Sequence, residues 1–146
     1  MSQTTLSSDK DKKIKLDFKD SKYATGRRKK SIAKVWVKKG SGNIHVNGLK
    51  MNEYFKRPVH QIIVTRPLEI SKATNNYDVK CSVKGGGLSG QAGAIILGIS
   101  KALISYDETF KKSLKKDKLT TRDSRVVERK KYGHRKARRS FQFSKR

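Results

Sequence analysis

The C-terminal quarter of the chain is the feature that most limits how it can fold. Residues 111–146 contain 16 Lys and Arg side chains and only 3 acidic ones, so this quarter carries about half of the formal net charge of +25. Few apolar side chains lie within it, and ordering a backbone must be offset by apolar burial. We therefore expect residues 119–146 to form a long extended basic tail outside the folded core.

The other end of the chain is expected to be a disordered polar arm. Residues 1–21 contain four Asp residues among their lysines and no apolar segment. They lack the hydrophobic region of a secretory signal, and their acids and missing arginines argue against a cleaved mitochondrial transit peptide. Periodic hydrophobic residues occupy positions 22–118, a length that suits one globular domain. No apolar run approaches the roughly 20 residues of a transmembrane helix. The net charge of +25 favours nucleic acid as the partner, with an anionic membrane surface second, and we expect no membrane partner.

Alternating hydrophobic residues predict two strands near the start of this domain. Apolar side chains alternate through "SIAKVWVK" (residues 31–38), and the alternation resumes in "IHV" (residues 44–46). A glycine-rich turn separates the two stretches, and the dipeptide Asn47-Gly48 tolerates positive φ. We expect these stretches to form a hairpin.

Two helical segments are expected next. One short turn is predicted at "MNEYF" (residues 51–55). A longer helix is predicted to begin at Pro58, because a first helical turn needs no donor from that residue, and to end at Pro67. Its apolar face is expected to consist of Val59, Ile62 and Ile63.

The second half of the domain has the clearest periodicity. Residues 78–84 alternate as a strand and place the only cysteine, Cys81, on its apolar face, where we expect a buried thiol. The longest helix is predicted to start with Ser89 as its N-cap and to continue to Tyr106. Asp107 is expected to cap a shorter helix that carries Phe110 and Leu114. These elements predict an α+β domain, with a small mixed sheet covered by helices.

The glycine-rich sequence "GGGLSG" raises the possibility of nucleotide binding. Gly85, Gly87 and Gly90 have the G-x-G-x-x-G spacing of a dinucleotide-binding turn. That motif, however, requires a following strand that ends in an acidic residue, and the pattern predicts only helices after it. The same glycines would let the backbone approach an RNA phosphate at a helix N-terminus. A dinucleotide-dependent enzyme remains an alternative, and it predicts cofactor binding that survives high salt.

No other pattern points to catalysis. The histidines His45, His60 and His134 are isolated and have no metal-ligand spacing with one another or with Cys81. The acidic residues are few and dispersed, which leaves no obvious general acid and base. We expect no enzymatic activity, no cofactor and no bound metal.

Two basic segments favour a nucleic acid as the partner. In "TGRRKKS", four consecutive cations precede the first expected strand, and Thr25, Ser31 and the amide of Gly26 could donate to phosphate oxygens. In the tail, Tyr132 and two phenylalanines are interleaved with cations, a composition that suits base stacking beside phosphate neutralisation. No segment resembles a major-groove recognition helix, so RNA is favoured, and a nucleoid-type DNA-binding protein is the second alternative.

Several longer motifs together resemble a known family. They are "YATGRRKKSIAKVWVKKGSGNIHVNG", "YFKRP", "RPLEI", "VKGGGLSGQAGAIILGISKAL" and "LTTRDSRVVERKKYGHRKARRSFQFSKR". In this order they resemble the universal ribosomal protein nine of the small subunit, in its bacterial and organellar form. The wording of "AKVWVKKGSG" and "RPV" is most similar to the α-proteobacterial and mitochondrial branch, so we expect a ribosome of the bacterial cytoplasm, with the mitochondrial matrix as the alternative.

The resemblance implies a fold, a function and a set of contacts. It implies a compact fold similar to the second domain of ribosomal protein five, located in the head of the small ribosomal subunit beside other head proteins. It also implies a structural role in translation, with the tail passing through head ribosomal RNA. The end of the tail, Ser144, Lys145 and Arg146, would contact the anticodon stem-loop of transfer RNA in the peptidyl site. The expected contacts with ribosomal RNA are Arg27, Arg28, Lys29, Lys84, Gly85, Gly86, Gly87, Gln91, Arg122, Arg125, Arg129, Lys130, Lys131, Arg135, Lys136, Arg138 and Arg139.

Overall fold

A computed structural model describes residues 19–144 and confirms the α+β class. The described strands are β1 (Lys22–Arg28), β2 (Ser31–Lys39), β3 (Ile44–Val46), β4 (Leu49–Lys50) and β5 (Tyr77–Lys84). The described helices are α1 (Met51–Tyr54), α2 (Pro58–Ile70), α3 (Leu88–Tyr106) and α4 (Phe110–Lys116). The expected short turn at residues 51–55 therefore corresponds to α1.

The five strands form one mixed sheet in the order β1-β2-β5-β3-β4, in which only β3 and β5 are parallel. The expected hairpin of residues 31–38 with residues 44–46 is wrong, because β5 lies between β2 and β3. Asn47-Gly48 does close a turn, but it joins β3 to the short β4. Local alternation identifies a strand and its faces, whereas the choice of neighbour depends on distant residues.

Strand β1 was not expected, since its residues were assigned to a basic segment ahead of the first strand. It pairs with β2 over its whole length, and Lys29, with φ of 52°, helps to turn the chain between them. Gly26 explains why this polar strand joins the fold. A Cβ at Gly26 would meet the carbonyl oxygen of Ala94 and would lie 2.6 Å from the amide nitrogen of Gly98, so glycine lets β1 pack directly on α3.

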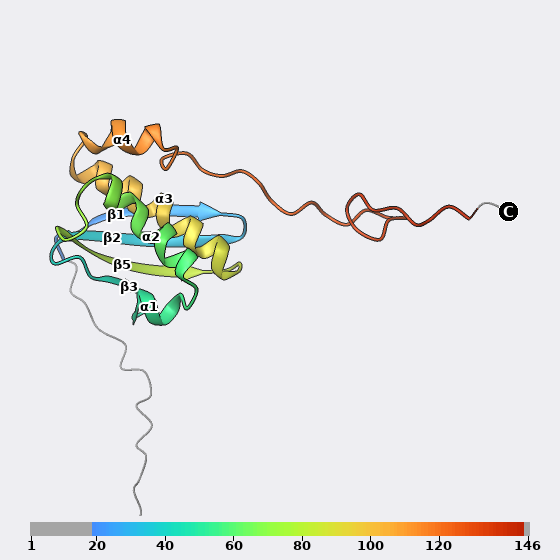
Figure 1. The fold of residues 1–146 in the computed structure, drawn as a ribbon, viewed down its shortest axis with the longest axis horizontal. Coiled ribbons are helices and arrows are strands. Elements are labelled where there is room, and N and C mark those ends of the chain that lie inside the picture. The colour runs from blue at the N-terminus through green and yellow to red at the C-terminus, as the bar shows by residue number, and fades with distance from the viewer. Residues whose placement is uncertain (1–18, 145–146) are drawn as a thin grey trace, which may run out of the picture.

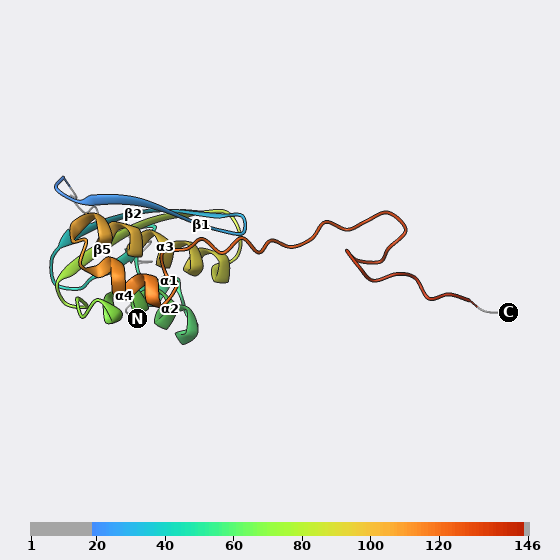
Figure 2. The same ribbon diagram turned by 90° about the horizontal axis from the view of Figure 1, so that it is seen from above.

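The helices α2, α3 and α4 lie on one side of the sheet, as Figure 2 shows. The core is the layer between sheet and helices, where the apolar residues of β2 and β5 meet α3. Cys81 is buried in this layer, as expected, and burial raises the pKa of its thiol well above the usual range. The opposite face of the sheet has no helix over it within residues 19–144.

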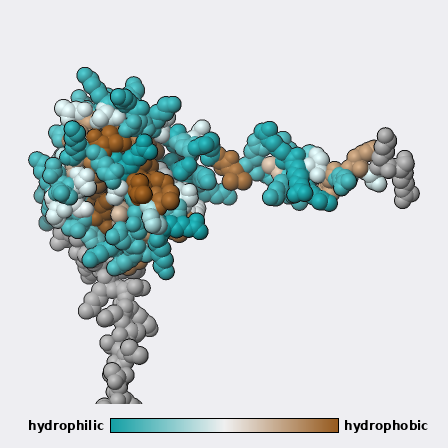
Figure 3. Space-filling model, in the orientation of Figure 1, coloured by the Kyte–Doolittle hydropathy of each residue, from teal (hydrophilic) through white to brown (hydrophobic). Residues whose placement is uncertain are grey.

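The expected end of α2 is wrong, and its expected apolar face is only partly right, because Ile63 alone of its three residues packs against the core. Pro67 lies inside the helix, which continues to Ile70, and the amide of Ser71 donates to the carbonyl of Pro67 at 3.2 Å. The buried residues of α2 are His60, Val64, Pro67 and Leu68. Val59 and Ile62 are instead 65% and 62% exposed, and Figure 3 shows apolar surface among hydrophilic side chains in the region of α2. Pro67 is nevertheless accommodated, and its ring is fully buried.

Helix α3 has the expected apolar stripe, with Ile95, Ile99, Ala102 and Leu103 buried. Its N-cap is Gly87 and not Ser89, which lies in the first turn. Its length of 19 residues and mean hydropathy of 1.3 would allow it to cross a membrane, contrary to the expectation that no run comes close. However, 67% of the 18-residue apolar window within this helix is buried inside the domain, as is typical of a core helix.

After α3 the described chain adds a helix but no further strand to the sheet. Asp107 is the C-cap of α3, and its carbonyl accepts a bond of 3.3 Å from the amide of Phe110 at the start of α4, whose own N-cap is Thr109. Leu114 is buried, as the sequence pattern indicates. Beyond α4 the chain runs away from the domain without helix or paired strand, up to residue 144 (Figure 1).

Candidate nucleic-acid interface

The fold brings the first basic motif next to the glycine-rich turn. The tip of the β1–β2 hairpin contacts the loop between β5 and α3, since Ile32 of β2 pairs with Lys84 at the end of β5. The hydroxyl of Ser31, whose side chain is 1% exposed, donates to the carbonyl of Gly85 at 2.9 Å. Ser31 therefore ties two loops together and is not the phosphate donor that the sequence suggested. Gly26 is likewise buried against α3.

The glycines allow a tight approach at this junction. Gly85 and Gly86 have φ values of 75° and 64°, a conformation that other residues rarely adopt. A Cβ at Gly85 would lie 2.6 Å from the carbonyl oxygen of Lys30, and one at Gly86 would clash with the hydroxyl of Ser31. At Gly87, in contrast, an added Cβ would meet nothing within 4 Å. The first two glycines are thus needed for packing, and the third leaves the N-terminus of α3 open.

The α3 N-terminus has the donors expected of a phosphate contact. The first amides of an α-helix have no partner inside the helix, and no side chain caps those of α3. No strand that joins the sheet follows α3 within residues 19–144, so the β-α-β unit required by a dinucleotide site does not form there.

Gln91 has a structural role in this arrangement. Its side-chain oxygen accepts a 2.8 Å bond from the hydroxyl of Tyr54, and its amide nitrogen lies 3.3 Å from the carbonyl of Gly85. These bonds connect the glycine turn to α1. An RNA contact by this side chain would have to share or replace them.

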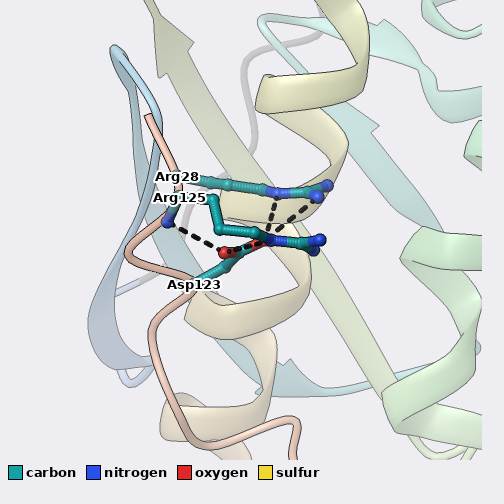
Figure 4. A network of polar contacts seen from close by, with 3 residues as sticks. All are labelled: Arg28, Asp123 and Arg125. Carbon is teal, nitrogen blue, oxygen red and sulfur yellow. Dashed lines mark hydrogen bonds and ion pairs between the residues drawn. The ribbon is translucent and has the colours of Figure 1, made fainter. Parts of the chain in front are cut away.

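Arg27 and Arg28 do not act as one patch. Successive side chains of a strand point to opposite faces, and Arg27 is exposed whereas Arg28 is partly buried beside Gly93 of α3. The Nη2 and Nε atoms of Arg28 lie 3.1 and 3.2 Å from Oδ2 of Asp123. Arg125 binds the same carboxylate through Nε at 3.0 Å and Nη2 at 3.0 Å (Figure 4).

Asp123 is the residue of this site that sequence reasoning missed. The hydrogen bonds from Arg125, together with the charge of Arg28, hold the pKa of the Asp123 carboxyl far below its usual range. The carboxylate thus connects the start of the tail to β1, 95 residues earlier in the chain. One signal was present in the sequence, because an acid is unusual in so basic a segment.

The hairpin tip, the glycine turn and the start of the tail enclose one notch of about 540 Å³. Its lining combines cations with apolar side chains and glycine backbone. Val126 and Val127 are 56% and 82% exposed and contribute the tail's side of it. The residues around the notch are Lys29, Lys30, Gly86, Gly87, Val126, Val127, Glu128 and Arg129. Lys30 and the two valines were not among the expected contacts.

Further along the tail, some cations are paired within the chain. Arg138 forms a bidentate ion pair with Glu128, at 2.9 and 2.7 Å, which lowers the pKa of that carboxyl. Arg135 lies over the ring of Phe141 at 5.3 Å. Arg129 lies over the ring of Tyr132 at 5.8 Å. Tyr132 and Phe143 are still 94% and 86% exposed, so each ring keeps a surface on which a base could stack.

The other expected contacts in the described part of the tail lie at its surface. Arg122, Arg129, Lys130, Lys131, Lys136, Arg139 and Ser144 are all exposed. Lys145 and Arg146 lie outside the described residues. Within residues 19–144 no three His, Cys, Asp or Glu side chains are grouped to hold a metal ion.

The chain is an α+β protein whose exposed loops and C-terminal segment converge on one basic, partly apolar notch, an arrangement that favours a polyanionic partner. The comparison with known families is more specific: residues 26–146 match the family described as ribosomal protein S9/S16, and the chain belongs to that family. It is therefore a structural ribosomal protein of the small subunit, a ribonucleoprotein component that functions in translation at the ribosome. The family is structural and not enzymatic.

Proposed function

We propose that the notch and the tail bind ribosomal RNA of the small-subunit head, and that the tail end reaches the anticodon stem-loop of transfer RNA in the peptidyl site. The observation that carries this proposal is the convergence of three segments, far apart in the sequence, on one notch in a member of this family. A folded RNA could be held there by cations, glycine backbone and apolar contacts together.

The contacts divide by position in the fold. At the notch, Lys29 supplies charge while the backbone of Gly86 and Gly87 approaches a phosphate at the N-terminus of α3. Lys84, at the end of β5, would bind the same RNA from beside the notch. Arg125 is exposed and its guanidinium can bind phosphate while it keeps its bond to Asp123. The remaining tail cations would follow the RNA backbone, and the exposed rings would stack on unpaired bases.

The length of the tail supports the proposed transfer RNA contact. Residues 120–146 could span on the order of 90 Å when fully extended, and the described part already runs away from the domain (Figure 1). We assign the last three residues, Ser144 to Arg146, to the transfer RNA. The neighbours of the domain would be other head proteins, and the ribosome would be that of a bacterial cytoplasm, with a mitochondrial ribosome as the alternative.

The test is a salt titration of the full chain on a transcript of the small-subunit head RNA, with duplex DNA as competitor. Each phosphate neutralised should contribute about 0.7–0.9 decades of affinity per decade of salt. A steep slope together with a strong preference for the RNA is the expected result. Equal binding to both nucleic acids would reduce the protein to a general polycation and would overturn the proposal.

A further inference from the structure

The face of the sheet opposite the helices carries a second candidate surface, distinct from the notch. Figure 2 shows the helices gathered on one side of the sheet. Because successive side chains of a strand point to opposite faces, every second side chain belongs to the other face. Tyr23 of β1 and Ile32 of β2 are 49% and 46% exposed on this face. These two large side chains lie on the edge strand β1 and on its neighbour β2.

An aromatic pair lies toward the β1 edge of this face. Tyr23 pairs with Trp36 in the β1–β2 register, and their rings lie 5.3 Å apart at an angle of 43°. Trp36 is followed across the sheet by Lys80 of β5 and then by His45 of β3. Because cross-strand neighbours on one face are in contact range, these four side chains form a continuous row.

Cations surround the aromatic pair. Lys34 and Lys38 lie two residues to either side of Trp36 on β2, and Arg27 and Lys84 flank Ile32 at the end of the face nearest the notch. The one acid in register with these positions is Asp78, opposite Lys38. Its carboxylate accepts bonds of 3.0 and 2.8 Å from the amides of Ser41 and Asn43. The face is therefore strongly positive around a pair of rings.

We propose that this open sheet face binds RNA, with an unpaired base stacked on Tyr23 and Trp36 and with flanking phosphates held by Arg27, Lys34 and Lys38. The inference rests on the proposed function for its ligand class but assigns a separate surface. Aromatic rings interleaved with cations are the arrangement that stacks bases and neutralises phosphates. A second copy of the chain would bring its own net charge of +25 against this face, so a polyanion fits better.

The single tryptophan makes the test specific. Since Trp36 is the only tryptophan in the chain, its fluorescence reports on this face alone. The full chain would be titrated with the head RNA transcript, with filter binding as an independent measure of occupancy. At saturation we expect strong quenching of the emission and loss of access to acrylamide, a neutral quencher.

Two sets of variants complete the test. Tyr23→Ala should weaken RNA binding by about 5- to 150-fold, the range for loss of one base–aromatic stack. Lys34→Gln with Lys38→Gln should lower the salt slope by about 1.4–1.8 in all, if each lysine holds one phosphate. The matched control is Lys115→Gln with Lys116→Gln on α4, which removes the same charge from the helix side and should leave the Trp36 signal unchanged.

The possible results distinguish a failure of this inference from a failure of the proposed function on which it rests. If RNA binds by filter assay while the emission and acrylamide access of Trp36 stay constant, the sheet face is not an RNA surface, although the notch and tail still are. If RNA does not bind at all, both proposals fail. If Trp36 is shielded in the free chain and becomes accessible on deletion of residues 1–18, the occupant is the chain's own N-terminal segment, which overturns the inference.

Discussion

Arg27 and Arg28 are adjacent in the sequence but contribute to different surfaces. Arg27 lies on the open face of the sheet, whereas Arg28 turns toward α3 and binds Asp123. A run of cations in the sequence therefore does not define a patch until the strand that carries it is known. Asp123 is a second example, because this one carboxylate joins the tail to Arg28 of β1, a contact that the local sequence does not indicate.

Replacing Asp123 by Asn should release the start of the tail while the domain stays folded. Both ion pairs of this carboxylate would be lost, and trypsin should cut at Arg122 and Arg125 several times faster. Little change in Tm is expected, because ion pairs near the surface contribute little to stability. Asp117→Asn, which removes an equal charge from the end of α4, is the control. Unchanged cleavage in Asp123→Asn would show that the tail is held by other contacts.

In the unmodified protein, the ion pairs of Asp123 with Arg28 and Arg125 should persist to low pH. The folded-state pKa of Asp123 is lowered, so its ion pairs are fully present above the ordinary carboxyl range, and they are lost only as the pH falls through the lower folded value. The protection factor for amide exchange at the tail root, which divides out the intrinsic pH dependence of exchange, should stay constant from pH 7 to about pH 4.

Cys81 should be unreactive in the folded protein. The thiolate is the nucleophile, and burial in β5 keeps the pKa of this thiol raised and the group neutral. Alkylation by iodoacetamide at pH 8 should be more than about tenfold slower than in guanidinium chloride, because modification requires opening of a central strand. Equal rates in the two conditions would contradict the burial of β5.

At the scale of elements, α2 shows how packing can override a local pattern. The spacing of Val59, Ile62 and Ile63 suggested an apolar face, yet the helix buries Val64 and Leu68 and leaves Val59 and Ile62 exposed. A helix with apolar residues on two sides can be rotated by its tertiary contacts. Pro67 is tolerated for the same reason, since its burial offsets the missing hydrogen bond.

A matched pair of alanine substitutions tests this orientation. Leu68→Ala removes a side chain that is 1% exposed and should lower the free energy of unfolding by about 2–5 kcal/mol. Ile62→Ala removes an exposed side chain and should change it by less than about 0.5 kcal/mol. Chemical denaturation measures both. The reverse ranking would mean that α2 packs through the face that the sequence suggested.

At the scale of the whole molecule, the chain separates a packed domain from an elongated cationic segment. Residues 120–146 contain eleven Lys and Arg and two acidic residues, and each acid is already paired with arginines of the tail. The domain can dock on RNA through its loops and sheet, while the tail extends into places that a globular body cannot enter.

Removal of Lys145 and Arg146 should separate these roles. We expect subunits that contain the shortened protein to assemble nearly normally, because the notch and most of the tail are intact, but to bind peptidyl-site transfer RNA more weakly. Sedimentation profiles measure assembly, and filter binding of transfer RNA to isolated subunits measures the site. A collapse of assembly would mean that the tail end is needed for folding the RNA.

The sequence by itself determined the α+β class, the buried faces of β2, β5 and α3, the position of the glycine turn and the family. These features follow from composition, from periods of two or 3.6 residues and from motif spacing, all of which are local. Only the tertiary structure decided the insertion of β5 between β2 and β3, the orientation of α2, and the meeting of hairpin, turn and tail. Those depend on contacts such as Ser31 with Gly85 and Arg28 with Asp123, which join residues 54 and 95 positions apart. Since each partner is chosen by packing and charge in three dimensions, no local pattern records the choice.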